Sequence, residues 1–360
     1  MRSFGVEEEL LLIEASSLEP MPVGQYLVDH HGATATGHRL SVEFQQEQLE
    51  VINPPCTTLD EQLATIRAGR GLADDAAREI GARAVALATA PAPATTHLVP
   101  ERRFEQIAAW GGLTARQQLT GGFHVHVQID SREEGAAILD RLRTWLPTLL
   151  ALSSNSPFWD GTDTGFHSYR YQLMNRWPAS GATEVFGSVI AYESYCEQLL
   201  ASRVVLDAGM IYFDARLSEN HPTVEVRVAD VCWEPEHAAV LAVLVRALAE
   251  TSARRWRAGH PPAPVPAGVL RAWMWQASRC GVESYLINPH TGTPAPAGDV
   301  VTHLLEHLHP VLTEYGEHDA VENVLTTILC EGTGAHHQRQ TQHTGKDLKG
   351  VVHAALPVTP

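Results

Sequence analysis

Acidic side chains alternate with apolar ones in the first segment of the chain, FGVEEELLLIE. Because successive side chains of a strand point to opposite faces, Glu7 and Glu9 share one face, and Glu8 lies on the other with Val6 and Leu10. Carboxylates that converge on one face repel each other unless they are protonated or bridged by cations. The segment therefore predicts a strand that carries two cation-binding carboxylates, and Glu8 needs a buried arginine or a place at the sheet edge.

Three later segments show the same alternation. His124 and His126 alternate with apolar residues in GGFHVHVQI, Glu225 and Arg227 in PTVEVRVAD, and Arg216 in MIYFDARLS. Each segment has one apolar and one ionic face, and the ionic faces carry almost no lysine. A water-covered face is the alternative, but histidine, glutamate and arginine favour a site. The pattern predicts an α+β fold in which helices pack on one face of an open antiparallel sheet.

The residue types on the ionic face suit a hard divalent cation. Carboxylate oxygens with an occasional imidazole are typical ligands of Mg²⁺ or Mn²⁺, and Glu7, Glu9, Glu225 and His124 supply them. Zinc is the competing metal, because His124, His126 and Glu225 could provide three ligands of a metal-dependent hydrolase. Both readings place a metal on this face of the sheet.

A second acidic segment, SVEFQQEQLEVINPPC, has a geometry that the sequence leaves open. Glu43, Glu47 and Glu50 would line one face of a helix, at i, i+4 and i+7. The β-branched residues before the Pro-Pro pair favour a strand at least from Leu49 onward. In one uniform strand, Glu43 and Glu50 would face opposite ways.

Composition narrows the class of protein. The chain has 360 residues, 44% of them hydrophobic, and a formal charge of -16, from 42 acidic and 26 basic residues. This field repels phosphate backbones, so we expect no nucleic-acid partner. No run of about 18 apolar residues suggests a membrane span, and no signal-peptide pattern opens the chain. Five scattered cysteines without a C-x-x-C pair fit a reducing cytosol. We expect a cytoplasmic protein.

Helical composition separates the predicted strands. Four helical segments are expected, at 59–90, 132–155, 193–206 and 235–258. Ser131 is a plausible N-cap for the second of them. A Pro-rich connection at 259–268 precedes a helical C-terminal part, and we treat 1–360 as a single catalytic domain. No phosphate-binding loop of the G-x-x-x-x-G-K-[ST] or G-x-G-x-x-G type occurs. A nucleotide would therefore have to bind through metals and arginines.

Several segments, taken in order, resemble the type 2 glutamate–cysteine ligase family, also called the carboxylate–amine ligases. They are FGVEEELLLIE, QEQLEVINPPC, GGFHVHVQI, ALSSNSPFWDGTDTGFHSYRYQLMNRWPASG, PTVEVRVADV and CEGTGAHHQRQ. The resemblance implies a fold like the catalytic part of glutamine synthetase, in which a curved, mostly antiparallel sheet forms a funnel with helices outside. It also implies that ATP phosphorylates a carboxylate and that an amine then displaces the phosphate. Mg²⁺ would hold the phosphates.

The resemblance also implies roles for individual residues. The metal ligands would be Glu7, Glu9, Glu43, Glu50, His124 and Glu225. Arg227 would contact the transferred phosphoryl group, and His126 would join it at the nucleotide. Arg170 is a candidate for the substrate carboxylate, since a guanidinium binds carboxylates in a bidentate way, and Arg216 is a candidate for either anion.

Three hypotheses about function follow. The first is an ATP- and Mg²⁺-dependent ligase, joining glutamate to cysteine or other amino acids of specialised metabolism. The second is the metal-dependent hydrolase with His124, His126 and Glu225. The third is a non-catalytic nucleotide- or amino-acid-binding protein, which would not need every metal carboxylate. For the ligase we expect small-molecule partners, ATP and amino acids, and a homodimer.

Overall fold

A seven-stranded sheet forms the centre of the computed structural model, which describes residues 1–356 except 33, 35–36 and 346. The strand order is β10-β11-β5-β1-β3-β2, and β4 also pairs with β1. All of these pairs are antiparallel. The strands are β1 (Phe4–Glu14), β2 (Arg39–Val42), β3 (Gln48–Ile52), β4 (Ala82–Val85), β5 (Gly122–Gln128), β10 (Ala215–Leu217) and β11 (Thr223–Asp230). The open antiparallel sheet and the helices around it confirm the predicted α+β class.

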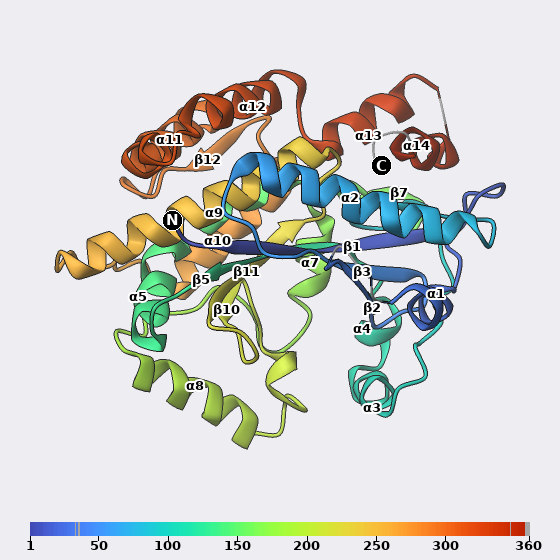
Figure 1. The fold of residues 1–360 in the computed structure, drawn as a ribbon, viewed down its shortest axis with the longest axis horizontal. Coiled ribbons are helices and arrows are strands. Elements are labelled where there is room, and N and C mark those ends of the chain that lie inside the picture. Colours follow the sequence, from blue (N-terminus) through green and yellow to red (C-terminus); the bar gives the residue numbers. More distant parts are fainter. Residues whose placement is uncertain (33, 35–36, 346, 357–360) are drawn as a thin grey trace.

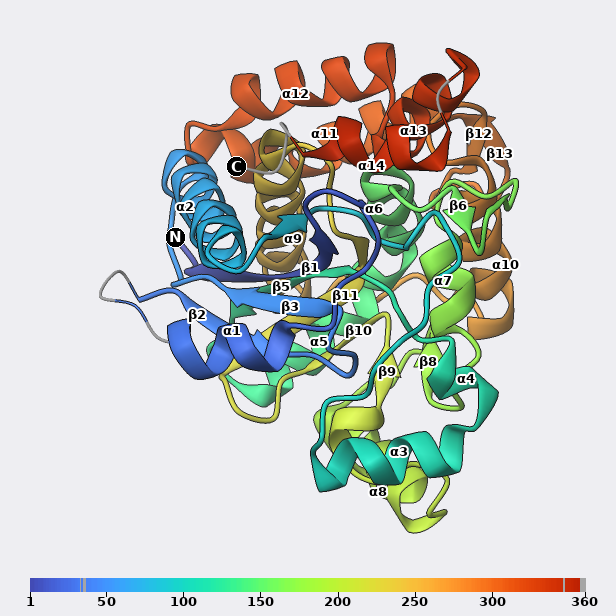
Figure 2. The ribbon, with the colours of Figure 1, turned by 90° about the vertical axis from the view of Figure 1, so that its right-hand side faces the viewer.

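Helices cover the apolar face of this sheet. In Figures 1 and 2, α2 (Leu59–Arg78), α9 (Pro235–Arg257), α11 (Ala297–Glu314) and α12 (His318–Glu331) all lie on one side of it. The side chains of Phe4, Val6 and Val125 point toward these helices and are buried in one core. On the other side lie α3 (Arg102–Gly111) and α8 (Val189–Ala201). The ionic face of the sheet therefore lies between the strands and this second group of helices.

The remaining elements are short or lie in the C-terminal part. The helices are α1 (Gly24–His31), α4 (Leu113–Arg116), α5 (Arg132–Leu142), η1 (Arg143–Trp145), α6 (Leu146–Ser153), α7 (Tyr169–Met174), η2 (Ala208–Met210), α10 (Ala267–Cys280), α13 (Gly334–His343) and α14 (Leu348–Ala355). The strands are β6 (Phe158–Trp159), β7 (Thr162–Asp163), β8 (Ser180–Gly181), β9 (Tyr212–Phe213), β12 (Tyr285–Ile287) and β13 (Pro294–Pro296).

The helix expected over 59–90 is wrong in its second half. α2 begins with a capping box between Thr58 and Glu61 and ends at Arg78. Gly81, with φ +77°, lies at the reversal that follows, a backbone conformation that favours glycine. The next residues form β4, which pairs with the end of β1. The alanine-rich sequence has helical propensity, but pairing with the buried strand overrides it.

The other predicted helical segments are helical in the structure, but their boundaries are shifted and one of them is divided. Ser131 caps α5 as expected, and its hydroxyl accepts a hydrogen bond from the Glu134 amide. The segment 132–155 contains three consecutive helices, α5, η1 and α6, rather than one. The predicted 193–206 helix is α8, which begins at Val189 after the cap Ser188 and ends at Ala201. The side chain of Ser188 caps the N-terminus of the helix, so the helix begins at the next residue.

The Pro-rich connection lies between α9 and α10, and the hydrophobic core continues beyond it. Met274 of α10, Leu304 of α11 and Leu325 of α12 belong to the same buried cluster as Phe4. In the part of the chain that the structure describes, no helix is long and apolar enough to cross a membrane.

Candidate active site

The strand registers bring the predicted ionic residues directly opposite one another. Three cross-strand pairs matter: Glu7 with His124, Glu9 with Glu50, and His126 with Glu225. Residues that are directly opposite in adjacent antiparallel strands share a face and have their Cβ atoms about 5 Å apart. The alternation in each segment predicted the face, and the registers supply the neighbours.

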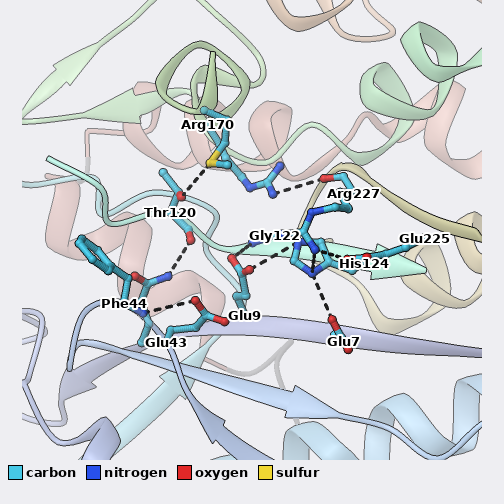
Figure 3. Close-up of polar contacts among 12 residues, drawn as sticks. Glu7, Glu9, Glu43, Phe44, Thr120, Gly122, His124, Arg170, Glu225 and Arg227 are labelled. Atoms are coloured by element: carbon cyan, nitrogen blue, oxygen red, sulfur yellow. Dashed lines mark hydrogen bonds and ion pairs between the residues drawn. The ribbon is translucent and has the colours of Figure 1, made fainter. Parts of the chain in front are cut away.

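Two groups of possible metal ligands result, and they share His124. Oxygen and nitrogen atoms of Glu7, His124 and Glu225 lie within 4.8 Å of one another, and so do those of Glu9, Glu50 and His124. His124 lies between the two acidic pairs, with Nδ1 3.3 Å from Glu7 and Nε2 3.5 Å from Glu9 (Figure 3). The donor set, four carboxylates and one imidazole, fits hard divalent cations such as Mg²⁺ or Mn²⁺.

The protonation of the cluster also fits a cation site. Burial and the neighbouring carboxylates Glu9 and Glu7 raise the pKa of Glu43 to about 8, and they raise the pKa of Glu50 well above its usual range. Contacts with His124 and His126 hold the pKa of Glu7 below its usual value, although burial opposes this. The carboxylates thus share too few positive partners, and a bound cation would supply the missing charge.

The acidic segment whose geometry was open is a β-hairpin with a short turn. β2 ends at Val42 and pairs with β3, which begins at Gln48, so the helical alternative is wrong. Glu43 lies in the turn between the two strands, where the backbone changes direction, and it lines the same cavity as Glu9. Glu50 lies on β3, directly opposite Glu9. Glu47 is buried elsewhere and accepts a hydrogen bond from the His97 amide.

Two arginines surround Glu225. Arg227 forms an ion pair with the Glu225 carboxylate, and its Nη1 lies 3.4 Å from Nδ1 of His124. Arg216, opposite Glu225 on β10, donates from Nε to Oε2 of Glu225 at 2.7 Å. These two guanidinium groups hold the pKa of Glu225 below its usual range in spite of its burial. Arg227 lines the neighbouring cavity, whereas Arg216 is engaged with Glu225 and does not.

Arg170 reaches the same cavity from α7. It is almost fully buried, and its Nη atoms lie 3.4 Å from the backbone carbonyls of Arg227 and Val228 (Figure 3). Its Nε has no hydrogen-bond partner in the described structure. Gly122 makes this approach possible, because a Cβ there would collide with the Arg170 guanidinium. Gly122, the first residue of β5, therefore has a packing reason that the sequence did not reveal.

A cavity of about 220 Å³ lies over the Glu9 side of the cluster. Its polar lining includes Glu9, Glu43, His124, Arg170, Arg227, Gln48, Gln118 and Thr120. Its other walls are aromatic or apolar and include Phe44 and Phe104, with Trp177 and Tyr212 opposite. Arginines beside carboxylates give the cavity anchors for both anionic and cationic groups, as an amino acid requires.

A second cavity, of about 380 Å³, lies on the Glu7 side of the cluster. Its lining includes Glu7, His126 and Gln128, and its apolar walls include Ile52, Pro55 and Pro222. Nε2 of His126 is buried, 3.4 Å from Glu7 and 4.0 Å from Glu225, and has no hydrogen-bond partner among the described residues. The cluster thus lies between two cavities, each of which reaches one of its acidic pairs.

The sequence did not indicate the residues that support Arg170. Asp230 is fully buried, and its carboxylate accepts hydrogen bonds from the Ser156 and Ser168 hydroxyls and the Asn155 amide. It lies 3.9 Å from Nη1 of Arg170. A buried aspartate at the end of an apolar strand was the available signal, in the segment PTVEVRVAD. The α3 residue Arg103, which pairs with Asp207 and lines the first cavity, gave no such signal.

Glu8 has the buried partner that its position required. Arg70 of α2 donates to both Glu8 oxygens, and neither side chain is exposed. Arg70 also donates to the backbone carbonyls of Cys232 and Trp233. Glu8 therefore belongs to the packing between sheet and helix and not to the ionic site.

Solved structures show the class of fold. A glutamate–cysteine ligase from Francisella tularensis, solved in complex with AMP, has a TM-score of 0.72 over 99% of this chain and 88% of that one, with 15% identity. A bifunctional glutathione synthetase from Pasteurella multocida has a TM-score of 0.70 over 99% of this chain and 52% of that one, with 17% identity. The protein therefore has the fold seen in these ligases.

Sequence comparison gives the family. The model of glutamate-cysteine ligase family 2 matches residues 3–355, so the chain belongs to this family of ligases. A Paenarthrobacter aurescens protein, provisionally named glutamate–cysteine ligase 2-1, is 49% identical over all of this chain and 95% of its own length. A Streptomyces coelicolor protein, provisionally named glutamate–cysteine ligase 2, is 42% identical over 99% of this chain and 98% of its own. The resemblance stated from the motifs is confirmed.

The hydrolase hypothesis loses its geometric basis. It required His124, His126 and Glu225 to meet at one metal ion. Among the described residues, the ligand atoms that meet are those of His124 and Glu225 with Glu7. Membership of the ligase family also favours the ligase hypothesis over the hydrolase hypothesis.

Proposed function

We propose that the protein is an ATP-dependent carboxylate–amine ligase that forms an amide or γ-glutamyl bond through an acyl phosphate, with glutamate and cysteine as the first substrates to test. The observation that carries this proposal is the position of the carboxylate cluster between two cavities. Phosphoryl transfer requires a phosphate donor and an acceptor to meet at a site of concentrated positive charge. The two cavities provide one compartment for each.

Glu7, Glu9, Glu43, Glu50, His124 and Glu225 would hold the cations. Bound Mg²⁺ would neutralise the charge that accumulates on the phosphates during transfer. In this proposal the protein's own contribution is to fix five of these ligands on four adjacent strands, and Glu43 in the turn between β2 and β3.

The nucleotide would bind in the second cavity. Its apolar walls suit a base, and the free Nε2 of His126 is available to a phosphate or ribose oxygen. Arg227 lies at the boundary with the first cavity, beside His124 and Glu225, where the γ-phosphoryl group would pass. Its guanidinium would then exchange part of its contact with Glu225 for the transferred group.

The amino-acid substrates would bind in the first cavity. Arg170 has a buried, unpartnered Nε and is fixed by Asp230, so it is ready to receive a carboxylate. Preorganisation of this kind stabilises the bound state because no side-chain ordering remains to be done. Arg216 would act through Glu225, which it holds in place.

The direct test is the release of ADP and phosphate with Mg²⁺ and ATP across panels of amino acids, in pairs and singly. We expect the formation of ADP and phosphate to depend on an added amino acid. Mass spectrometry of the ligated product would identify the bond. No dependence in any panel would contradict the ligase proposal, and nucleotide binding without turnover would support the non-catalytic alternative.

Glu225→Gln tests the site itself. The variant keeps the size of the side chain and removes its charge, and we expect turnover to fall by about a hundredfold to a thousandfold, as when other preorganised charges are lost. Glu19→Gln is a matched control, since Glu19 is exposed on the surface and pairs with Lys349. Equal turnover of the two variants would refute the role of Glu225.

Light scattering tests the predicted homodimer.

A further inference from the structure

A third cavity lies away from the catalytic cluster, where α5 and η1 meet the C-terminal end of α9. It has a volume of about 90 Å³. The Pro-rich connection, the loop after β12 and α11 complete its walls. α5 and α9 pack side by side in this region (Figure 1). Its described lining shares no residue with the two cavities of the candidate active site.

The charge of this cavity is opposite to that of the protein. The chain has a formal charge of -16, but the described lining contains Arg141, Arg255, His290 and His307 and no acidic residue. These groups are close enough to repel one another. Burial, together with Arg255 and His290, lowers the pKa of His307 to about 4. Burial and the nearby Arg255 lower the pKa of Arg141, although Asp140 opposes this.

The two arginines lack the carboxylate partners that neighbouring arginines have. Arg254 and Arg257, beside Arg255 on α9, form ion pairs with glutamates. Arg255 forms none with any described residue. The Nη atoms of Arg141 donate to the carbonyls of Ala137 and His260, and its buried Nε has no partner. Arg255 and Arg141 therefore form no ion pair in the described part of the chain, although Asp140 lies near Arg141.

Two hydroxyl groups also line the cavity and form no hydrogen bond with the described residues. Thr144 and Ser252 are 5% and 2% exposed. In the described structure neither hydroxyl forms a hydrogen bond, although serine and threonine hydroxyls inside helices commonly donate to a carbonyl of the preceding turn. Neither hydroxyl oxygen is fully buried, so both hydroxyls are accessible from the cavity to a ligand with acceptor oxygens.

The walls of the cavity are stiff. Pro261, Pro262 and Pro289 line it, and Trp145 lies at its base with its ring stacked on His307 at 5.3 Å between centroids. Proline fixes its own backbone angle and offers no amide donor. A preformed site of this kind loses little entropy when it binds a ligand.

We propose that this cavity is a binding site for a phosphate dianion, either free inorganic phosphate or the phosphoryl group of a small metabolite. Arg255 and Arg141 supply the charge, and Ser252 and Thr144, each three residues from one of these arginines on the same segment, supply hydroxyl donors. Donors converging from several elements match the tetrahedral oxygens of a phosphate. The proposal does not depend on the ligase activity.

Isothermal titration with inorganic phosphate tests the site. The titration uses the full chain with Arg227→Gln, so that the anion site of the catalytic cluster contributes least. Two further titrations use sodium chloride at matched ionic strength and glycerol 3-phosphate in place of inorganic phosphate. We expect saturable binding of phosphate but not of chloride. Binding of glycerol 3-phosphate with equal or higher affinity would identify a phosphorylated metabolite as the ligand, and weaker binding would identify free phosphate.

Substitution locates the binding. Arg255→Gln, on the protein surface, should weaken phosphate binding about tenfold. Arg39→Gln is the control, because Arg39 is also exposed and forms no ion pair in the described structure but lies on β2. Absence of phosphate binding at millimolar concentrations, or equal affinity of the Arg255 variant and the control, would overturn the proposal.

Discussion

Replacing Glu8 by glutamine should destabilise the protein without removing an active-site group. Glu8 and Arg70 form an ion pair in which both side chains are fully buried, at 2.7 Å between Oε1 and Nη2. Glutamine retains the shape of the side chain but leaves the Arg70 guanidinium without a counter-charge. The two backbone carbonyls that Arg70 also contacts cannot neutralise it.

Removal of one partner from a buried ion pair costs about 3–5 kcal/mol, because the remaining charge has no compensation. For a two-state protein of this length, the entropy of unfolding is about 0.75 kcal/mol per kelvin near the midpoint. The expected fall in Tm is therefore about 4–7 °C. Replacing both residues together, as Glu8→Met with Arg70→Met, should recover much of the loss, since an apolar pair of similar volume leaves no charge behind.

Calorimetry and urea unfolding of the single and double variants provide the measurement. Glu19→Gln is the matched control, because the Glu19–Lys349 pair is exposed and such pairs contribute about 0–1 kcal/mol. Turnover of Glu8→Gln, measured well below its Tm, should stay within a few-fold of the parent. A Tm change no larger than that of the control, or a loss of turnover in the folded variant, would refute the assignment of Glu8 to packing.

Three further predictions concern the site and its surroundings. Arg170→Lys should lower kcat/KM for the carboxylate substrate about a hundredfold with little change in Tm, because lysine cannot form two parallel bonds; an unchanged value would show that the substrate binds elsewhere. Burial raises the pKa of Asp214 to about 7, so the native state keeps a proton that the unfolded chain releases between about pH 4 and 7. Stability falls as pH rises through this window, by at most about 4 kcal/mol. The free energy of unfolding of Asp214→Asn, relative to that of the parent, should therefore increase as pH rises. Parallel pH profiles of the two proteins would contradict this. Because the pKa of Glu43 is raised to about 8, Mg²⁺ binding near pH 7 should release protons. Calorimetry of Mg²⁺ binding in buffers of different ionisation enthalpy measures the number of protons released. Identical heats in all buffers would exclude proton release.

The local pattern was enough to predict much of the site. Alternation in single strands separated Glu7 and Glu9 from Glu8, because a period of two depends only on backbone geometry. The motifs of the strands that form the candidate site were enough to name the family. The segment 82–85 shows the limit of such patterns, since its pairing with β1 determines its structure more than its own alanines do.

Sequence alone thus determined the chemical nature of the site, a face of carboxylates, histidine and arginine on an otherwise apolar sheet. Only the tertiary structure decided which of these groups meet. Glu43 and Glu50 face the same side because a turn separates two strands, and Arg170 approaches because Gly122 has no side chain. Register, turns and close approaches depend on contacts between segments far apart in the chain. No local pattern contains them.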